Sequence, residues 1–487
     1  MRSRLYNYSK SIKIRRVQYA NIICILVCCI FFNNNSYSSE EKDDKKTIIK
    51  YIERTYHDDL KLSPTELEQL SWAQNNDYSS NEMGILVKPG IIRIEVIRSL
   101  NGLYDLNLFV KGDKKAYKLF IKAQGNSPHK LAESSFIILS KIFKGLSKVE
   151  IEALRVATIL RAVRKSPHQF KFVVDKHLNN TLFYENLLAL SLRENHSIYP
   201  LAKEFCQQDI NRVDLLKMQI NYQMSFKQML HADGGQNMFK NLRKLIIHNN
   251  FSHKDFDIWM CSWILNIAAL YSHVDHKGSL YLNQQVFEDI INLRKILRAF
   301  IKNPAIDPVR AYLAYRAKKT GINCLKNHQK SLTLARIGAL LKLHSTEDGN
   351  KLLEAYNELP ATLQDEINNE NNLQLTVDSM LSPIHVSVFF TNVYLYQKRN
   401  IKETLKICLP IYLNAILIYQ DTINKGNLDE IPLSFNQLAS EREIAKIVNL
   451  TNEKRKIDLQ ISKDGYVKIN NNTIIKPNIK VHIVTKK

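Results

Sequence analysis

The chain has 487 residues, of which 45% are hydrophobic, and a formal net charge of +22. Its 14 glycines and 12 prolines are few for this length, which disfavours both a disordered chain and a large β-sandwich. The positive charge favours anionic partners such as lipid headgroups, nucleic acid or an acidic protein surface, although lysines spread over solvated helix faces would give the same total.

Residues 1–38 have the order of regions that is typical of a secretory signal peptide. A basic start precedes the apolar run Ala20–Phe32, and a polar stretch follows in which Ser36-Tyr37-Ser38 offers a cleavage site. We therefore expect an exported protein, periplasmic or extracellular. The alternative is an uncleaved anchor, and membrane contact would then be confined to this segment, but spanning a bilayer takes about 20 apolar residues. Cleavage removes six positive charges and no acid, leaving +16.

Residues 39–126 are expected to hold a helical lead-in followed by a three-stranded antiparallel meander. Ser63 is a typical N-cap, with Pro64 at the first helical position and Glu66 completing a capping box. After it the apolar pattern changes to period two, and Asn101-Gly102 is a strong hairpin signal. The strands expected in the meander are residues 91–97, 104–110 and 117–121.

Residues 127–450 are expected to form a large helical domain, because apolar residues recur there at helical spacing. Ser127-Pro128 and the capping box from Ser147 to Glu150 mark two helix starts. Residues 451–487 return to alternating patterns and predict a small β unit. The fold class is therefore mainly α (α+β). The strands expected in the C-terminal unit are residues 457–461, 466–469, 473–475 and 479–484.

Histidine and aspartate are concentrated in residues 248–289, and most densely at positions 273–276. Imidazole and carboxylate groups bind Zn²⁺, Mn²⁺ or Fe²⁺, and the metal-bound water then becomes a nucleophile. His273 and His276 are the candidate metal ligands, and Asp275 is a candidate ligand or catalytic base.

The remaining ligands of such a site would come from His231 and Asp233, or from Glu288 and Asp289. Residues 256–271 predict a buried helix, and if it runs unbroken from His253 to His273 these two residues lie about 30 Å apart and cannot share one ion. The histidines after this helix would also suit its negative end without any metal.

A second pattern is that of the serine acyl-enzymes of the penicillin-binding and β-lactamase type, which use Ser-x-x-Lys, Tyr-x-Asn and Lys-Thr-Gly in that order. Here the three motifs are Ser127–Lys130, Tyr184–Asn186 and Lys319–Gly321. The last motif follows a predicted helix, whereas this chemistry needs it on a strand.

Four cysteines follow the signal segment, and they suit either two disulfides or buried thiols. They are Cys206, Cys261, Cys324 and Cys408.

The sequence thus predicts an exported, basic, mainly helical protein that works by binding an anionic or protein partner. It carries no nucleic-acid recognition motif and no nucleotide-binding loop. The alternative is a metal-dependent hydrolase, such as a phosphoesterase, built on His273, Asp275 and His276 with a divalent metal as its cofactor.

Overall fold

The computed structural model describes the chain in segments. They are residues 44–74, 92–163, 192, 196–220, 224–249, 251–274, 277–324, 327–369, 373, 375–376, 383–424, 432–455, 457–463 and 465–470. Within them the chain forms 19 α-helices, a few short 3-10 turns and one two-stranded sheet, so a mainly helical fold is confirmed. The expected signal peptide, residues 1–38, lies outside the described residues. No described helix is both long enough and apolar enough to span a bilayer.

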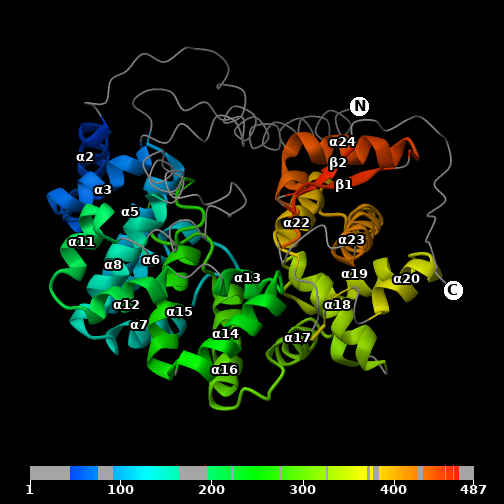
Figure 1. Ribbon diagram of the computed structural model, residues 1–487, viewed down its shortest axis with the longest axis horizontal. Helices are drawn as coiled ribbons and strands as arrows, with labels where there is room; N and C mark the ends of the chain where they lie inside the picture. Colours follow the sequence, from blue (N-terminus) through cyan, green and yellow to red (C-terminus); the bar gives the residue numbers. More distant parts are fainter. Residues whose placement is uncertain are drawn as a thin grey trace, which may run out of the picture.

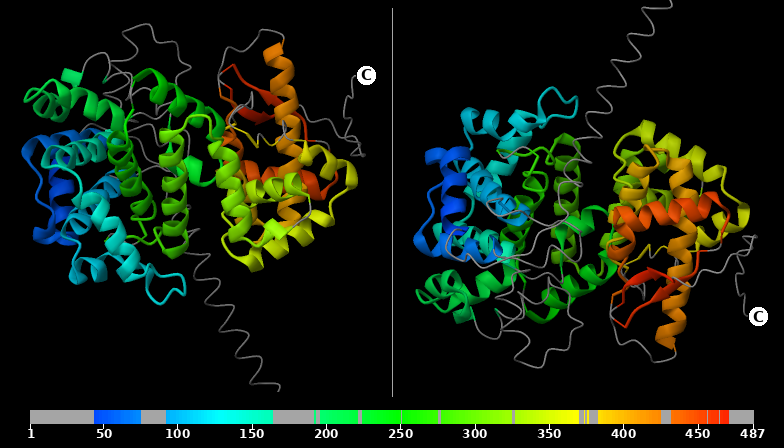
Figure 2. Two further views of the ribbon diagram at one scale, coloured as in Figure 1. Left: turned by 90° about the horizontal axis from the view of Figure 1, so that it is seen from below. Right: turned by 90° about the horizontal axis from the view of Figure 1, so that it is seen from above.

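The helices form two lobes that lie side by side in all three views (Figures 1 and 2). The N-terminal lobe consists of α2 (Asp44–Thr55), α3 (Pro64–Gln74), α5 (Ile94–Lys111), α6 (Lys114–Phe120), α7 (Glu133–Lys144), α8 (Lys148–Val163), α11 (Pro200–Cys206), α12 (Asn211–Gln219), α13 (Phe226–Leu230), α14 (Gly235–Asn249), α15 (His253–Ala268) and α16 (Gln284–Lys302).

The C-terminal lobe begins with a helix that packs on α14 and α16 and so joins the two halves. The lobe consists of α17 (Pro308–Lys319), α18 (His328–Leu340), α19 (Thr346–Asn357), α20 (Ala361–Asn368), α22 (Val386–Tyr396), α23 (Ile401–Asn424), α24 (Glu441–Asn452), β1 (Leu459–Ile461) and β2 (Val467–Ile469).

Helix α5 is the centre of the N-terminal lobe, and it overturns the predicted meander. It packs on α7, α8 and α15, and 12 of its 18 residues are buried. A helix buried nearly all round carries no polar face, so its sequence shows no helical period, and the alternation before Asn101 is accidental. Gly102 makes no turn: a Cβ there would lie 3.0 Å from Thr158 Cγ2, so the glycine allows α8 to pack closely.

The second expected hairpin turn is the end of α5. Gly112 has φ +58 and caps the helix by donating its N–H to Leu108 O at 2.8 Å. Glycine adopts this left-handed conformation without strain, which makes it a common helix terminator. Residues 117–121, the predicted third strand, belong mainly to α6.

Local helix signals were more reliable than periodicity. At the start of α3, the Ser63 N–H donates to Glu66 Oε2 at 2.8 Å and the Glu66 N–H donates to Ser63 Oγ at 3.2 Å, which confirms the predicted box. The box at the start of α8 is also present. The predicted start at Ser127 is wrong: that segment is a turn, and α7 begins at Glu133.

The C-terminal sheet is an antiparallel hairpin in which Gln460 lies opposite Lys468. Its two strands agree with the first two predicted there, and the other two predicted strands lie outside the described residues. The hairpin is attached to the lobe through Ser434, whose carbonyl accepts the Val467 N–H at 2.9 Å.

Candidate functional site

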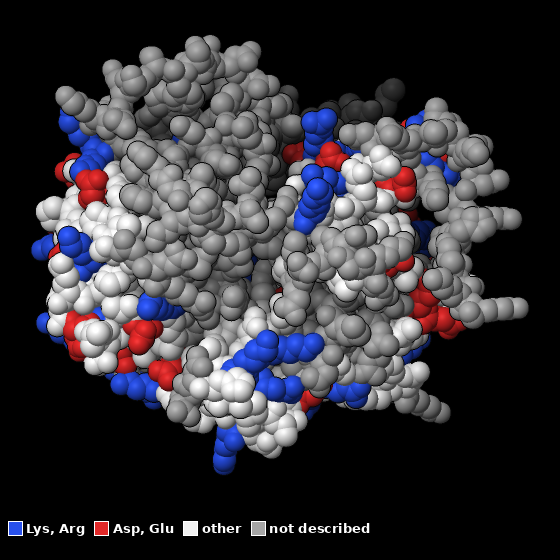
Figure 3. All heavy atoms as spheres, in the orientation of Figure 1, with Lys and Arg blue, Asp and Glu red and all other residues white. Residues whose placement is uncertain are grey.

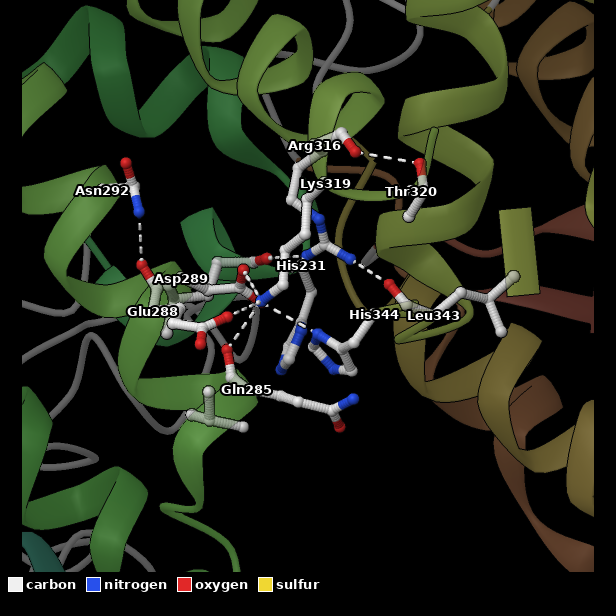
Figure 4. Close-up of polar contacts among 12 residues, drawn as sticks. His231, Gln285, Glu288, Asp289, Asn292, Arg316, Lys319, Thr320, Leu343 and His344 are labelled. Atoms are coloured by element: carbon white, nitrogen blue, oxygen red, sulfur yellow. Dashed lines mark hydrogen bonds and ion pairs between the residues drawn. The ribbon is translucent and has the colours of Figure 1, made fainter. Parts of the chain in front are cut away.

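A buried carboxylate, Asp289 of α16, lies where the two lobes meet (Figure 4). Its Oδ1 is 2.7 Å from Lys319 Nζ and accepts the Tyr315 hydroxyl at 3.0 Å. Its Oδ2 is 3.3 Å from Arg316 Nη1 and 3.0 Å from His344 Nδ1. We call these five residues the junction cluster.

Local helix geometry assembles this cluster. Arg316 and Lys319 are three residues apart on α17, so they project from one side of it towards α16. His344 lies in the turn between α18 and α19, where Lys342 adopts φ +58. The cluster therefore ties the last helix of the N-terminal lobe to the first helices of the C-terminal lobe.

The two cations of the cluster donate mainly to neighbouring protein groups, although Arg316 Nε has no hydrogen-bond partner among the described residues. Arg316 donates to the carbonyls of Leu230 and Leu343 as well as to Asp289. Lys319 donates to Gln285 O at 2.9 Å and lies 3.4 Å from Glu288 Oε2. Because an ammonium group has three donors, Lys319 has none left for a ligand.

Burial and charge set the ionisation of the cluster. Burial alone would raise the pKa of Asp289, but Arg316, His344 and Lys319 hold the pKa of this carboxyl well below its usual range. Burial lowers the pKa of His344, and Arg316 and Lys319 lower it further, against the effect of Asp289. The cluster thus holds an ionised aspartate beside a neutral histidine at neutral pH.

A second buried histidine, His231, lies beside His344 (Figure 4). Its Nε2 is 3.2 Å from the Tyr281 hydroxyl, and its Nδ1 has no hydrogen-bond partner among the described residues. Burial lowers its pKa well below the usual value, and the charges of Lys342, Lys227 and Arg316 act in the same direction. His231 is 6% exposed and contacts the Tyr281 hydroxyl, which indicates a structural role.

The residues predicted to bind metal are only partly described. His273 is exposed after α15, with its ring 6.3 Å from that of Tyr271, whereas Asp275 and His276 lie outside the described residues. In the described part of the chain, no three His, Cys, Asp or Glu side chains converge as a metal site requires. Of the four candidates for the remaining ligands, His231, Glu288 and Asp289 lie at the junction.

Asp233, the fourth candidate, caps a helix of the other lobe. Its carboxylate accepts the backbone N–H groups of Val386 at 3.1 Å and Ser387 at 3.4 Å, and the Ser387 hydroxyl at 2.8 Å. These groups form the start of α22. Asp233 is therefore a second buried polar link between the lobes.

The acyl-enzyme pattern does not fit the structure. The Lys319-Thr320-Gly321 motif ends helix α17, where that chemistry needs a strand, and its lysine is held by the junction cluster. The cysteines whose side chains are described, Cys206, Cys261 and Cys408, are buried free thiols.

An open groove of about 570 Å³ lies in the N-terminal lobe, between α7, the first turns of α8 and α15, and the second half of α16. One wall is aliphatic. Charged side chains form most of the rest, and four of these six are cations. The aliphatic residues are Ile138, Ile142 and Leu146; the charged ones are Lys141, Glu150, Lys254, Asp257, Arg294 and Arg298; Gly145 and His253 complete the lining.

One carboxylate organises the two arginines of the groove. Arg294 donates from Nε and Nη2 to Asp257 Oδ1 at 3.2 and 3.0 Å, and Arg298 donates from Nη1 to Asp257 Oδ2 at 2.7 Å. The arginines are four residues apart on α16, so Asp257 also offsets their mutual repulsion. A guanidinium has five N–H donors, so each arginine retains donors for a ligand. We call Arg294 and Arg298 the arginine pair.

The groove has a positive balance. Its four lysines and arginines face two carboxylates, which leaves a net charge of +2. The positive ends of α8 and α15 open onto the same groove and add to its potential. No motif of the sequence marks this site, although Arg294 and Arg298 are four residues apart on an amphipathic helix.

Comparison with known proteins gives a family without an assigned activity. No curated protein and no solved structure matches the chain. Residues 93–406 match the model of a family of unknown function, DUF6829. This match runs from α5 to the start of α23, so it includes the groove and the junction cluster and covers more than half of the sequence. The chain therefore belongs to the DUF6829 family.

Proposed function

We propose that this protein is an exported binding protein whose groove holds an anionic partner. The arginine pair carries the proposal, because two half-buried guanidinium groups are fixed side by side with donors left over. Guanidinium groups match carboxylate and phosphate oxygens in geometry as well as charge. Export rests on the N-terminal sequence alone.

The surface charge supports an anionic partner. Helix α14 has three lysines or arginines and no acid. On the face shown in Figure 3, basic side chains gather at the lower centre, where α14 and α16 lie in Figure 1. Such a surface raises the rate at which an anion meets the groove.

The test is a titration of the full chain with fluorescein-labelled poly-L-glutamate, followed by anisotropy. We expect Arg294→Ala/Arg298→Ala to weaken binding by about tenfold or more, since two charge-assisted contacts are lost. The matched control is Lys398→Ala/Arg399→Ala in the turn after α22, which should change the affinity by less than about twofold. An equal loss in both variants would mean diffuse surface attraction and would overturn the proposal.

Asp257→Asn separates a built site from simple charge attraction. This change adds one positive unit to the groove but frees the two arginines from their common partner. If charge alone mattered, polyglutamate would bind more tightly. We expect weaker binding, because the guanidinium groups lose their fixed positions. Tighter binding by Asp257→Asn would contradict the assigned role of the arginine pair.

A further inference from the structure

The partner of the groove can be narrowed from the surface next to it, an argument that rests on the proposed function. Helix α7 exposes two adjacent aliphatic side chains, Ile137 at 40% and Ile138 at 45%. Val149, at the start of α8, is 36% exposed. Single exposed aliphatics are common, but Ile138 lines the basic groove and Ile137 is its neighbour in sequence.

Lysines surround these aliphatic residues. Lys141 and Lys144 follow Ile137 by four and seven residues, so the three share one stripe of α7. The side chain of Lys144 lies against Gly112, where an added Cβ would come within 2.8 Å of its Nζ. This contact brings the first turn of α6 and its exposed lysines to the same end of α7.

The density of charge in this part of the chain is high. Residues 111–149 contain nine lysines and two acids. Helices α6 and α7, drawn in cyan, lie at the edge of the molecule in both views of Figure 2. We define the α7 face as Ile137, Ile138, Lys141 and Lys144 of α7 together with Lys114 and Lys115 of α6.

We infer that the α7 face docks onto a phospholipid bilayer with acidic headgroups, one of which enters the groove. Exposed aliphatic side chains ringed by lysines are typical of proteins that lie in a membrane interface. The aliphatic residues enter the boundary of the acyl chains, the lysines meet the headgroups, and the arginine pair binds a phosphate.

The lining and volume of the groove favour a lipid headgroup over nucleic acid or a folded protein element. Of its lining residues only His253 carries a ring, so the groove offers no series of rings on which successive nucleic-acid bases could stack. Its volume of about 570 Å³ suits a single headgroup-sized ligand rather than a folded element of a protein. A soluble acidic protein segment is the remaining occupant, and the experiment is designed to detect it.

The test is flotation of the full chain with vesicles of phosphatidylcholine alone or with about one third phosphatidylserine. The N-terminal segment is common to all variants, and neutral vesicles report its contribution. We expect binding that needs phosphatidylserine and that falls at high salt, because headgroup attraction is screened.

Two variants of the α7 face separate the contributions of its aliphatic and basic side chains to vesicle binding. Ile137→Ser/Ile138→Ser removes exposed aliphatic groups, and Lys114→Glu/Lys115→Glu reverses charge in the first turn of α6, where acids do not disfavour a helix. Each should weaken binding to the acidic vesicles by about tenfold or more. The matched controls in the C-terminal lobe are Leu395→Ser/Tyr396→Ser and Lys398→Glu/Arg399→Glu, which should bind like the parent chain.

The outcomes distinguish this inference from the proposed function. If polyglutamate binds through the arginine pair but acidic vesicles do not bind, the partner is a soluble acidic segment and the membrane inference fails alone. If neither probe binds, both fail. Equal losses in the face variants and their controls would overturn the α7 face as the docking surface.

Discussion

The junction cluster and the groove are built from the same residue types, arginine, lysine, aspartate and histidine, in opposite settings. At the junction, Asp289 and Arg316 are 3% and 1% exposed, and Arg316 Nη1 and Nη2 and Lys319 Nζ donate to protein groups. In the groove, Asp257, Arg294 and Arg298 are 24%, 26% and 35% exposed, and donors remain. The buried charges of the junction cluster stabilise the fold, whereas the partly exposed arginines of the groove keep N–H donors that can bind an anion.

The largest expected effect tests this contrast directly. Asp289→Ala leaves Arg316 and Lys319 buried without their counter-charge and should lower the free energy of unfolding by about 3–5 kcal/mol. The equivalent change in the groove, Asp257→Ala, should cost about 1 kcal/mol or less, because its partners are solvated. Urea unfolding of both variants measures the difference. Similar losses would mean that burial does not separate the two sites.

The next effect is acid sensitivity of the junction. The pKa values of His231 and His344 are lowered from 6.5 by burial, so below that pH the unfolded chain binds protons that the folded chain does not. The free energy of unfolding should therefore fall as the pH drops below 6.5. Each of the two histidines should contribute a fall of about 1.4 kcal/mol per pH unit until the pH reaches its pKa in the folded chain.

The check is urea unfolding across this pH range. His231→Gln/His344→Gln should flatten the pH dependence, while His129→Gln, in an exposed turn, should leave it unchanged. Asp289 acts in a separate window: its lowered pKa stabilises the fold above its usual value of 3.8, and this contribution is lost below it. An unaltered slope in the double variant would show that these histidines are not the acid-sensitive groups.

Loss of a helix N-cap should have a smaller effect on stability, and the effect should be equal at the groove and at the junction. Ser252 caps α15 at the groove, and Ser345 caps α19 beside the junction, each in a complete capping box. Replacement of either serine by alanine should cost about 1 kcal/mol, and replacement by glycine only a few tenths. Thermal unfolding measures both pairs. Unequal costs would show that tertiary contacts, rather than the caps, determine these values.

The smallest expected change in stability is that of Arg298→Ala. An exposed ion pair contributes about 0–1 kcal/mol, so the free energy of unfolding should scarcely move. Binding of polyglutamate should nevertheless weaken, and the loss should shrink at high salt. A large loss of stability would show that Arg298 has a structural role like that of the junction residues.

Much of the fold could be predicted from local signals, because they depend on neighbours in sequence. The capping boxes at Ser63, Ser147 and Ser252 specify three helix starts, and the C-terminal hairpin follows from its alternation and Gly465. Helix α5 could not be predicted, since a helix enclosed by its neighbours loses the periodic pattern on which such predictions depend.

The sites were predicted less well because their contacts join distant residues. Asp289 meets Arg316 and His344, 27 and 55 positions later, and no local pattern marks such a meeting. In the sequence, Asp289 is only one of four candidates for the remaining ligands of a metal. The positions of Arg294 and Arg298 depend on Asp257, which belongs to another helix. The sequence shows only that the two arginines share one helical face.

The cap that Asp233 provides for α22 has a consequence during synthesis. This aspartate leaves the ribosome 153 residues before Val386, the residue it caps. Until that partner emerges, the carboxylate has to remain hydrated, which keeps water at the surface that will later be buried between the lobes. The contact of Asp233 with α22 therefore forms only when most of the second half of the chain has been made. For a protein exported as proposed, this delay would favour passage through a secretion channel in unfolded form.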